Sequence, residues 1–214
     1  MVRREPAVAV WVGMKAKVRV PTLRKEREGW GTQTDEIKNP TLSRKTRQGW
    51  GTRTKAERSY RTMDITWLDE EERIGVGGGI WNAANMEKVA KLGITHIVDM
   101  QIECDDRKLG PEEHGIEVLW NPTDDDFLPK PPELFQAGMD FVQAAFKERA
   151  DAKVFIHCAA GVHRAPMMAL AVLCSIKQMS MDDARELIED KRPVADFADV
   201  YVESVRAFLD GRGT

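Results

Sequence analysis

The pattern of hydrophobic and polar positions changes near residue 63 and divides the chain into two parts. In residues 1–62, apolar side chains are sparse after Val20, and neither a helical nor a strand period runs far. We therefore expect a disordered N-terminal extension. In residues 63–214, short β-branched runs alternate with longer runs whose apolar residues recur at helical spacing. This alternation predicts one α/β domain, with a central, mostly parallel sheet flanked by helices.

Regular elements follow one another closely in the second part. Asn82 is the expected cap of a helix that Gly93 ends, and Ser180 is the expected cap of a later helix that stops before Pro193. The glycines at 77–79 predict a hairpin or a tight turn. The expected elements are a strand from residue 72 into the glycine turn, strands over 94–100, 116–120 and 154–156, and helices over 82–92, 133–149, 167–176, 180–191 and 199–209.

The segment from Val154 to Pro166 carries the clearest chemical pattern. A buried strand is expected to end just before Cys158, and an apolar helix follows the segment directly. A loop between a strand end and a helix N-terminus presents unpaired N–H groups that attract an anion. Gly161 and the alanines beside it let such a loop curl so that successive N–H groups point inward. The planar side chain of Arg164 can then clamp two oxygens of a phosphate.

Cys158 is the candidate nucleophile of this loop. Positive surroundings favour its thiolate form, which would face the phosphorus atom of a bound phosphate. The Cys-x5-Arg spacing by itself is a weak signal, because it arises by chance in many chains. The alternative interpretation, a buried structural Cys beside a surface Arg, leaves Gly161 and the helix start unexplained. Taken with His157 and the strand–loop–helix context, the pattern predicts a cysteine phosphatase.

Residues His157 to Pro166 resemble the phosphate-binding loop of the dual-specificity branch of the protein tyrosine phosphatases. Their Arg-Ala-Pro ending is similar to that of the phosphatases of regenerating liver and of plant glucan phosphatases. The resemblance runs from about Arg73 to Leu209 and implies a protein tyrosine phosphatase-like fold. It implies a phosphomonoester hydrolase, most simply a protein tyrosine or dual-specificity phosphatase, that works through a phosphocysteine intermediate. Such chemistry requires no metal and no other cofactor, and none is expected here.

The resemblance also implies a role for each loop residue. Cys158 is the nucleophile, and His157 helps to orient the loop, which is compatible with a buried structural histidine. The phosphoryl oxygens are bound by the Arg164 side chain and by the N–H groups of Ala159, Ala160, Gly161, Val162, His163 and Arg164.

Two loop positions depart from the family pattern. Most relatives have Ser or Thr where this chain has Ala165, and Gly is common where it has His163. His163 can add a donor near the phosphate, or it can simply face solvent, and we favour the second interpretation. Cys174 falls on the apolar helix and is expected in the core. Cys104 lies three residues beyond the position where relatives place a protective Cys, so a reversible disulfide with the nucleophile is a further hypothesis.

A general acid is needed to protonate the leaving oxygen, and three adjacent carboxylates are candidates. Asp124, Asp125 and Asp126 lie on a loop after an expected strand. Trp120 to Asp125 resembles the Trp-Pro-x-Asp-Asp segment of the regenerating-liver phosphatases, whose second Asp is the acid, and this implies Asp125. Asp126 is the second candidate, because the loop here has one residue more. Mutual repulsion favours retention of a proton by one of the three, and at least two are expected to be solvated loop charges.

The charge distribution limits the classes of molecule that the protein is expected to bind. The net charge is −3, yet residues 1–62 hold 16 of the 32 Lys and Arg and only 6 of the 35 Asp and Glu. The balance is therefore +10 in the extension and −13 in residues 63–214. A domain this acidic is a poor candidate for nucleic-acid binding. We expect a phosphorylated substrate, by default a phosphoprotein, and make no prediction of the oligomeric state.

The cysteine content and the absence of long apolar runs bear on location. Three cysteines at no metal-like spacing predict neither a disulfide framework nor a metal site. A thiolate nucleophile needs a reducing compartment, and no run approaches the length of a membrane span or forms a convincing secretory signal. We therefore expect a cytoplasmic protein.

The extension contains an imperfect repeat. Gly-Trp-Gly-Thr occurs at residues 29–32 and again at 49–52, each time after a Pro-Thr-Leu segment. Two copies are too few for a solenoid. In one interpretation the two basic, Trp-containing motifs bind an acidic partner. In the other, the true start is Met63, and the residues before it are a linker or mis-assigned translation.

Two alternatives to a protein phosphatase stay open. The first is a slow or inactive phosphatase-like module that captures a phosphorylated or acidic partner, which Ala165 keeps in view because some Arg-Ala-Pro relatives turn over slowly. The second is a phosphatase of a non-protein substrate, such as a phosphoglucan or a phosphoinositide. The loop lacks the lysines that suit highly charged inositol phosphates, so the sequence favours a phosphoprotein.

Overall fold

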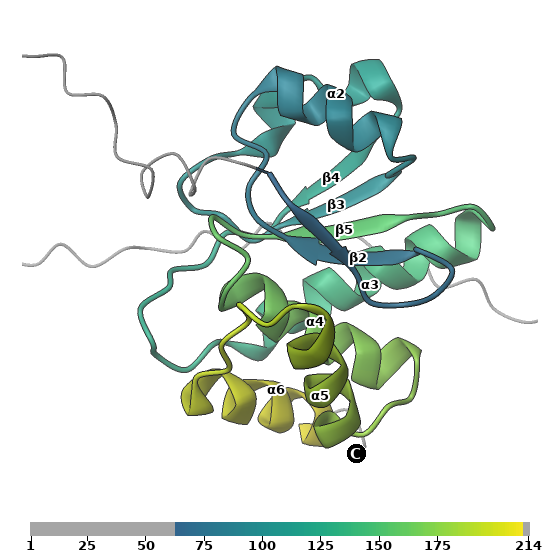
Figure 1. Ribbon diagram of the computed structural model, residues 1–214. Helices are drawn as coiled ribbons and strands as arrows, with labels where there is room; N and C mark the ends of the chain where they lie inside the picture. Colours follow the sequence, from purple (N-terminus) through teal and green to yellow (C-terminus); the bar gives the residue numbers. More distant parts are fainter. Residues whose placement is uncertain (1–62, 212–214) are drawn as a thin grey trace, which may run out of the picture. The chain divides into compact units, whose positions relative to one another are not determined.

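A computed structural model describes residues 63–211. The predicted extension, residues 1–62 with both Gly-Trp-Gly-Thr motifs, lies outside the described residues, and its disorder and the domain boundary at 63 stay predictions. The described residues form an α/β structure of the predicted class, a mostly parallel sheet with helices on both faces (Figure 1).

The sheet has five strands in the order β1-β2-β5-β3-β4. Strand β1 pairs antiparallel with β2, and all other neighbours run parallel. The parallel strands therefore end at one edge of the sheet, which is where open α/β sheets bind ligands. The strands are β1 (Ile65–Trp67), β2 (Ile74–Gly77), β3 (His96–Asp99), β4 (Glu117–Trp120) and β5 (Val154–His157).

Alternating side chains of the central strands enter two separate cores. Phe155 of β5 and Ile97 of β3 pack toward the side covered by α2 (Ala83–Lys91). Ile156 and Val98, one position further along the same strands, pack into the larger core on the other side. Successive strand residues point to opposite faces, so the continuous apolar run of β5 reflects a strand that is covered on both sides.

The larger core lies beneath a group of four helices, as Figure 1 shows on the side of the sheet opposite α2. Helix α4 is buried along most of its length and contacts each of the other three. The four helices are α3 (Pro132–Glu148), α4 (Arg164–Ile176), α5 (Met181–Lys191) and α6 (Asp199–Gly211).

The predicted helix caps are confirmed. Asn82 Oδ1 accepts a hydrogen bond from Asn85 N at 2.9 Å at the start of α2. Ser180 Oγ accepts one from Asp183 N at 3.1 Å at the start of α5. Gly93, just past α2, has a φ of +78°, which a residue without a Cβ adopts at little cost. The starts of α2 and α5 and the end of α2 therefore lie where the sequence predicted them.

The structure differs from the sequence-based expectation around the first strand. The hairpin lies before β2, over residues 68–73, and joins it to the unpredicted edge strand β1. Asp69 Oδ1 closes this turn by accepting from Arg73 N and Ile74 N at 2.8 and 2.9 Å. The glycines at 77–79 form no hairpin. Gly77 ends β2, Gly78 and Gly79 follow it, and the segment lies against the phosphate loop. The sequence did not predict strand β1, because a strand of three residues shows no recognisable period.

Two further elements refine the prediction. Helix α4 begins at Arg164, three residues before the expected start at Met167, so the loop arginine already belongs to the helix. The expected polar loop between β3 and β4 contains two 3-10 turns, η1 (Asp106–Leu109) and η2 (Pro111–His114). Among the described residues, no helix is both long and apolar enough to cross a membrane.

Candidate active site

The predicted phosphate loop lies at the carboxyl edge of the sheet, between the end of β5 at His157 and the start of α4 at Arg164. Cys158 is the first residue of this loop, and only 2% of it is exposed. Its Sγ accepts a hydrogen bond from Gly161 N at 3.3 Å. The thiol sulfur therefore lies inside the curl of the loop, at the N-terminus of a 13-residue helix whose dipole attracts an anion.

Gly161 is the loop position that no other residue can fill without a shift of its neighbours. Its φ is +66°, and a Cβ built there would lie 2.4 Å from Arg192 Nη2 and 2.5 Å from Gly77 O. The glycines after β2 make this close approach possible, and Gly79 N donates to Ala159 O at 3.2 Å. The two glycine-containing segments thus pack backbone against backbone, which explains the glycines that do not form a hairpin.

Arg192, at the end of α5, holds the outer side of the loop. Its Nε donates to Gly161 O at 2.7 Å and its Nη2 to Ala160 O at 3.3 Å. Its Nη1 donates to Asp64 Oδ2 at 2.9 Å and to Thr66 Oγ1 at 3.1 Å, and the arginine is 3% exposed. Because a planar trans peptide points its N–H opposite to its C=O, drawing these carbonyls outward turns the following N–H groups inward.

Arg164 is held by partners on two other loops. Its Nη1 donates to Glu103 Oε2 at 2.9 Å and to Thr123 O at 3.0 Å, and its Nη2 donates to Glu103 Oε1 at 2.8 Å. Burial disfavours the charge of Arg164, but Glu103, Cys158 and Asp125 together outweigh burial and raise the pKa of the guanidinium above its usual value. Glu103 in turn has a lowered pKa, chiefly through its hydrogen bond to Arg164.

The remaining donors of Arg164 form a free fork. A guanidinium has five N–H groups, and the bonds to Glu103 and Thr123 use three of them. The two left are Nε–H and the second N–H of Nη2, which share one edge of the planar group. Nε is buried and has no hydrogen-bond partner among residues 63–211. A buried, unpaired fork beside a cysteine-containing anion loop is suited to two oxygens of a phosphoryl group.

Of the three candidate acids, Asp125 is the one that faces the loop. Its Oδ2 lies 3.9 Å from Arg164 Nε and 2.9 Å from His163 Nδ1, and its Oδ1 accepts from Tyr201 OH at 3.1 Å. Asp126 instead pairs with Lys130, whose hydrogen bond lowers the pKa of that carboxyl. Asp124 is exposed. The geometry therefore favours Asp125, the residue that the family resemblance implied, over Asp126.

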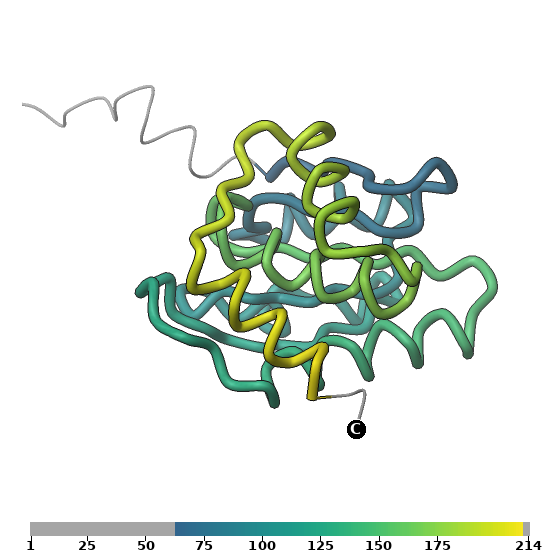
Figure 2. The backbone as a smooth tube through the Cα atoms, turned by 90° about the horizontal axis from the view of Figure 1, so that it is seen from below, coloured from purple at the N-terminus to yellow at the C-terminus, as the bar shows by residue number. Residues whose placement is uncertain are grey.

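The acid loop is anchored on α6. Phe127 N donates to Tyr201 OH at 3.0 Å, and Lys130 N donates to Ser204 Oγ at 3.0 Å. The ring of Phe127 stacks on that of Tyr201 with centroids 5.8 Å apart. Figure 2 shows the chain leading into α6, in yellow, beside the teal segment between β4 and α3. The position of Asp125 thus depends on a helix more than 70 residues further along the chain.

His163 does not simply face solvent, and that favoured interpretation is wrong. Its side chain is 19% exposed, and Nε2 lies 3.3 Å from Asp196 Oδ2 while Nδ1 contacts Asp125. The imidazole therefore bridges the acid loop and the segment before α6. The sequence could not predict these two contacts, because Asp125 and Asp196 are 38 and 33 residues away from His163.

A buried cluster of ionisable groups lies behind the loop. His157 Nε2 is 2.8 Å from Asp106 Oδ2 and 3.8 Å from Asp99 Oδ1, and all three side chains are fully buried. Burial opposes the imidazolium, but Asp106 and Asp99 outweigh it and raise the pKa of His157. Burial also raises the pKa of Asp99 to about 7, although His157 counteracts part of this effect. A charged His157 directly behind Cys158 adds to the positive surroundings of the thiolate.

The same cluster has the composition of a metal site, which the sequence did not reveal. One ligand atom from each of Asp99, Asp106 and His157 falls within 4.8 Å of the others. The close pairing of His157 with Asp106 already gives these groups a partner in one another. Asp99 lies further from the imidazole, at 3.8 Å, and completes the buried cluster.

The other two cysteines lie outside the loop. Cys174 is half-buried against the larger core, as expected for a residue of the apolar helix. Cys104 is a free thiol, and burial together with Asp106 and Asp99 raises its pKa to about 11. A thiolate is scarce at such a pKa, so Cys104 is poorly suited to attack an oxidised Cys158.

Four site residues were not found from the sequence. Glu103 belonged to an expected polar loop, and nothing local distinguishes its carboxylate from its acidic neighbours. Tyr201 was assigned to a helix by its spacing alone, and Arg192 lay between the expected end of the helix over 180–191 and Pro193. Asp64 lies just before the unpredicted edge strand. All four act through partners at least 31 residues away, as the Arg192–Gly161 and Arg164–Glu103 pairs show.

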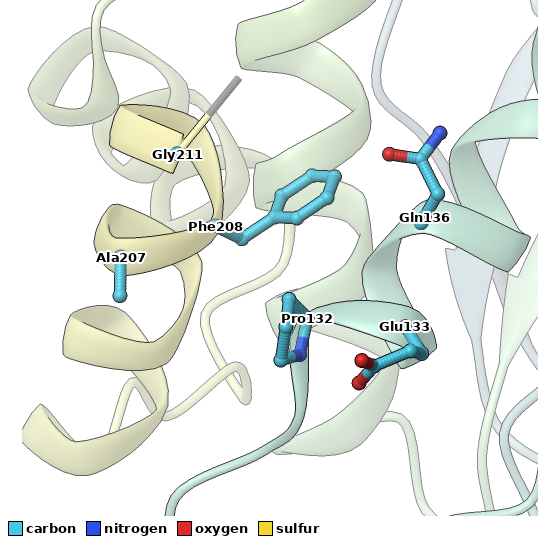
Figure 3. Close-up of a pocket in the computed structure, with 6 residues that line it drawn as sticks. All are labelled: Pro132, Glu133, Gln136, Ala207, Phe208 and Gly211. Atoms are coloured by element: carbon cyan, nitrogen blue, oxygen red, sulfur yellow. The ribbon is translucent and has the colours of Figure 1, made fainter. Parts of the chain in front are cut away.

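A cavity of about 430 Å³ lies elsewhere, between the start of α3 and the end of α6 (Figure 3). None of the phosphate-loop or acid-loop residues described above belongs to its walls. The lining residues are Pro132, Glu133, Gln136, Ala207, Phe208 and Gly211.

Comparison with known families agrees with this site. The family model described as "Dual specificity phosphatase, catalytic domain" matches residues 79–209, which is more than half of the chain. The chain belongs to the dual-specificity phosphatase catalytic-domain family, a branch of the cysteine-dependent protein tyrosine phosphatases. The match contains the phosphate loop, the acid loop and the partners of Arg164.

Three of the curated relatives share 28% to 34% of the aligned residues with this chain. Human dual specificity protein phosphatase 16 is 28% identical over 109 residues, which cover 51% of this chain and 16% of that protein. Human protein phosphatase Slingshot homolog 3 is 31% identical over 121 residues, 55% of this chain and 17% of the relative. Mouse protein tyrosine phosphatase type IVA 2 is 34% identical over 110 residues, 50% of this chain and 62% of the relative. The chain thus spans less than a fifth of the two human proteins.

Solved structures show the same fold. The crystal structure of PTPMT1 in complex with PI(5)P superposes with a TM-score of 0.61 at 18% identity and covers 70% of this chain and 99% of that one. Human DUSP28 gives a TM-score of 0.59 at 18% identity, with 70% and 95% covered. At this level of identity the likeness concerns the fold alone.

Proposed function

We propose that this chain hydrolyses phosphomonoesters through a phosphocysteine intermediate and that its substrate is a phosphoprotein. The observation that supports this most directly is the free, buried fork of Arg164, which lies at the helix start that follows the Cys158 loop. The site thus offers a thiolate, a rigid ring of backbone donors and a bidentate cation, which together suit a phosphoryl group.

The first half of the reaction transfers the phosphoryl group to the cysteine. Two phosphoryl oxygens bind the Arg164 fork, and the others bind N–H groups of the loop. The Cys158 thiolate attacks phosphorus as the bond to the leaving oxygen breaks. Asp125, 3.9 Å from Arg164 Nε, protonates that oxygen, so the alcohol leaves without a negative charge.

The second half releases phosphate. A water molecule takes the place of the alcohol, and Asp125, now a carboxylate, accepts one of its protons. The resulting hydroxide attacks phosphorus, the sulfur–phosphorus bond breaks, and the thiolate returns. His157 stabilises this thiolate from behind the loop, because Asp106 and Asp99 hold the imidazole in its charged form.

A phosphoprotein substrate is supported by the surroundings of the site. Phe127 and Leu128, next to Asp125 on the acid loop, are 51% and 59% exposed. The Phe127 ring lies 5.1 Å from the ring of His163, so an apolar surface borders the loop. Exposed apolar residues suit the side chains and backbone of a peptide better than a highly charged inositol phosphate. A cytoplasmic location is proposed as well, because the thiolate needs a reducing compartment.

A phosphoinositide is the second candidate substrate. It is favoured by the likeness in fold to PTPMT1, whose structure was solved in complex with PI(5)P. Against it stands the absence of lysine in residues 157–166.

Turnover of a generic aryl phosphate, compared between wild type and Cys158→Ser, tests the proposed function. We expect turnover by the wild type and a fall to the background rate in the variant. Tight binding of phosphopeptides without turnover would instead identify a binding module. A panel of phosphotyrosine, phosphoserine and phosphothreonine peptides, phosphoinositides and phosphoglucan then separates the substrate classes by kcat/KM.

A further inference from the structure

The side chains around Asp125 bear on how it can act as an acid. Its carboxylate accepts from Tyr201 OH at 3.1 Å, contacts His163 Nδ1 at 2.9 Å and lies 3.9 Å from the buried Arg164 Nε. Tyr201 and His163 can each place a hydrogen-bond donor against the carboxylate, and Arg164 directs a positive charge toward it. A general acid must carry a proton when the substrate is bound, so a neighbouring group that can deliver a proton to Asp125 would serve the reaction.

His163 is suitably placed to hold it. Its Nδ1 faces Asp125 Oδ2 at 2.9 Å, and its Nε2 faces Asp196 Oδ2 at 3.3 Å. A neutral imidazole donates from one nitrogen only, whereas an imidazolium donates from both. An imidazolium at this position can donate to both carboxylates at once, which a neutral ring cannot do. The backbone fixes this arrangement, since Asp196 N donates to Val162 O at 2.8 Å, next to His163 in the loop.

We propose that His163 is a positioning residue that stores the proton of the general acid and passes it to Asp125 when a phosphoryl group occupies the loop. This inference rests on the proposed phosphatase function. It assigns a role to His163, which occupies a position where the resembled family commonly has glycine.

Substrate binding supplies the reason for the transfer. A phosphoryl dianion on the Arg164 fork neutralises the nearest positive charge and places negative charge close to Asp125. Both changes favour a neutral carboxyl. The proton then moves from His163 Nδ1 to Asp125 Oδ2 along the 2.9 Å contact. Asp125 passes it to the leaving oxygen as the phosphorus–oxygen bond breaks and the bond to Cys158 Sγ forms.

The second half of the reaction restores the starting state. Asp125 takes a proton from the attacking water and returns it to His163 Nδ1, while hydroxide becomes part of the phosphate and the thiolate leaves. Over one cycle, ester and water give alcohol and phosphate, and His163 regains its proton. No further reactant is needed.

The charged and titratable groups near His163 come from four parts of the chain. The acid loop contributes Asp125 with its neighbours in sequence, of which Asp126 is paired with Lys130. The phosphate loop and α4 contribute Cys158 and Arg164, the segment before α6 contributes Asp196, and α6 contributes Tyr201 through its bond to Asp125.

The sharpest test replaces the proton store but keeps the hydrogen bond. In His163→Asn, the amide N–H can still donate to Asp125 from about the position of Nδ1, but an amide does not release a proton. At neutral pH we expect kcat/KM of this variant to fall by about tenfold to hundredfold for a poor leaving group, within the usual worth of general acid catalysis. For a good leaving group, kcat/KM should change by less than about twofold. The deficit should shrink as pH is lowered, because Asp125 then takes its proton from solvent.

Matched variants and a measurement on the resting enzyme complete the test. His114→Asn, at an exposed position in η2, should keep the wild-type profile. Ring ¹⁵N chemical shifts should show His163 as an imidazolium at neutral pH in the wild type and as a neutral ring in a protein carrying both Asp125→Asn and Asp196→Asn. A wild-type pH profile in His163→Asn, an equal loss for both leaving groups, or a neutral His163 ring in the wild type would each overturn the proposal. Lack of aryl phosphate turnover in the wild type would instead refute the proposed function, and the ring shifts would still decide the protonation of His163.

Discussion

The phosphate loop and the acid loop face each other across the site but are built in opposite ways. The phosphate loop, residues 158–164, is held from behind by buried groups, and its two arginine supports, Arg164 and Arg192, are each 3% exposed. The acid loop, residues 124–130, is largely exposed and rests on side chains of α6. The buried phosphate loop binds the phosphoryl group, which all substrates share. The exposed acid loop contacts the leaving group, which differs between substrates.

This contrast predicts two kinds of functional loss. Damage to the phosphate loop should lower the rate for every substrate, because every phosphoryl group uses the same donors. Damage to the acid loop should depend on how much help the leaving oxygen needs. Leaving-group dependence therefore separates the two regions experimentally.

The largest effect is expected from Asp125→Asn. The variant should lose about 10²–10⁴-fold in kcat/KM for phosphates with poor leaving groups and much less for those with good ones, because a good leaving group needs little protonation. Asp126→Asn is the matched control and should change little, since Asp126 pairs with Lys130. If Asp126→Asn shows the leaving-group pattern and Asp125→Asn does not, the acid is assigned to the wrong residue.

Arg164→Lys should lose about 10²–10³-fold, the usual range for one lost transition-state donor, and the loss should be the same for good and poor leaving groups. A lysine keeps the charge next to Glu103 but offers no planar fork. Steady-state kinetics over a series of aryl phosphates measure both properties. A loss confined to poor leaving groups would break the proposed division between the two loops.

Ala165→Ser should raise kcat by about tenfold with little change in kcat/KM. A hydroxyl after the loop arginine, which most of the resembled family has, can donate to the thiolate as it leaves, and a hydrogen bond to a charged group is worth about 1.5–3 kcal/mol. The wild type should then show a burst of leaving group before a slower steady state. Rapid-mixing kinetics decide the matter, and no burst together with no gain in the variant would mean that breakdown of the intermediate is not limiting.

The smallest effect concerns the pH dependence of stability behind the phosphate loop. The pKa of Asp99 is raised to about 7 in the folded protein from an ordinary value of 3.8, so the folded state binds this proton more tightly. The stability that the proton contributes is full below about pH 4 and is lost as pH rises toward 7. The Tm of the wild type minus that of Asp99→Asn should therefore decrease over this range. A difference that stays constant with pH would show that Asp99 is ionised throughout.

The same contrast explains what the sequence could predict. The phosphate loop was located correctly between a strand and a helix, because Cys158, Gly161 and Arg164 lie within seven consecutive residues and each has a local reason to be there. Helix caps such as Asn82 could be predicted for the same reason, because the capping residue lies next to the helix that it caps. The class of fold followed from the alternation of periods, and the edge strand β1 was missed because three residues show no period.

The acid side was less predictable for a physical reason. The choice of Asp125 came from a family resemblance, and the contacts that distinguish it from Asp126 come from Tyr201, His163 and Lys130. Two of these partners are 76 and 38 residues away from Asp125. Hydropathy patterns record which face of an element is buried, but they do not record which polar groups meet across loops. Glu103 and Arg192 were overlooked for the same reason.

Direct observation of the phosphoenzyme tests the central claim, that Cys158 carries the phosphoryl group. Wild-type protein and Cys158→Ser would be mixed with a rapidly reacting aryl phosphate, quenched after one turnover under conditions that preserve a thiophosphate bond, and analysed by peptide mass spectrometry. The account predicts that the wild type gains the mass of one phosphoryl group on the peptide that contains Cys158 and that the variant gains none. Turnover without such an adduct, or an adduct on Cys104 or another residue, would contradict it.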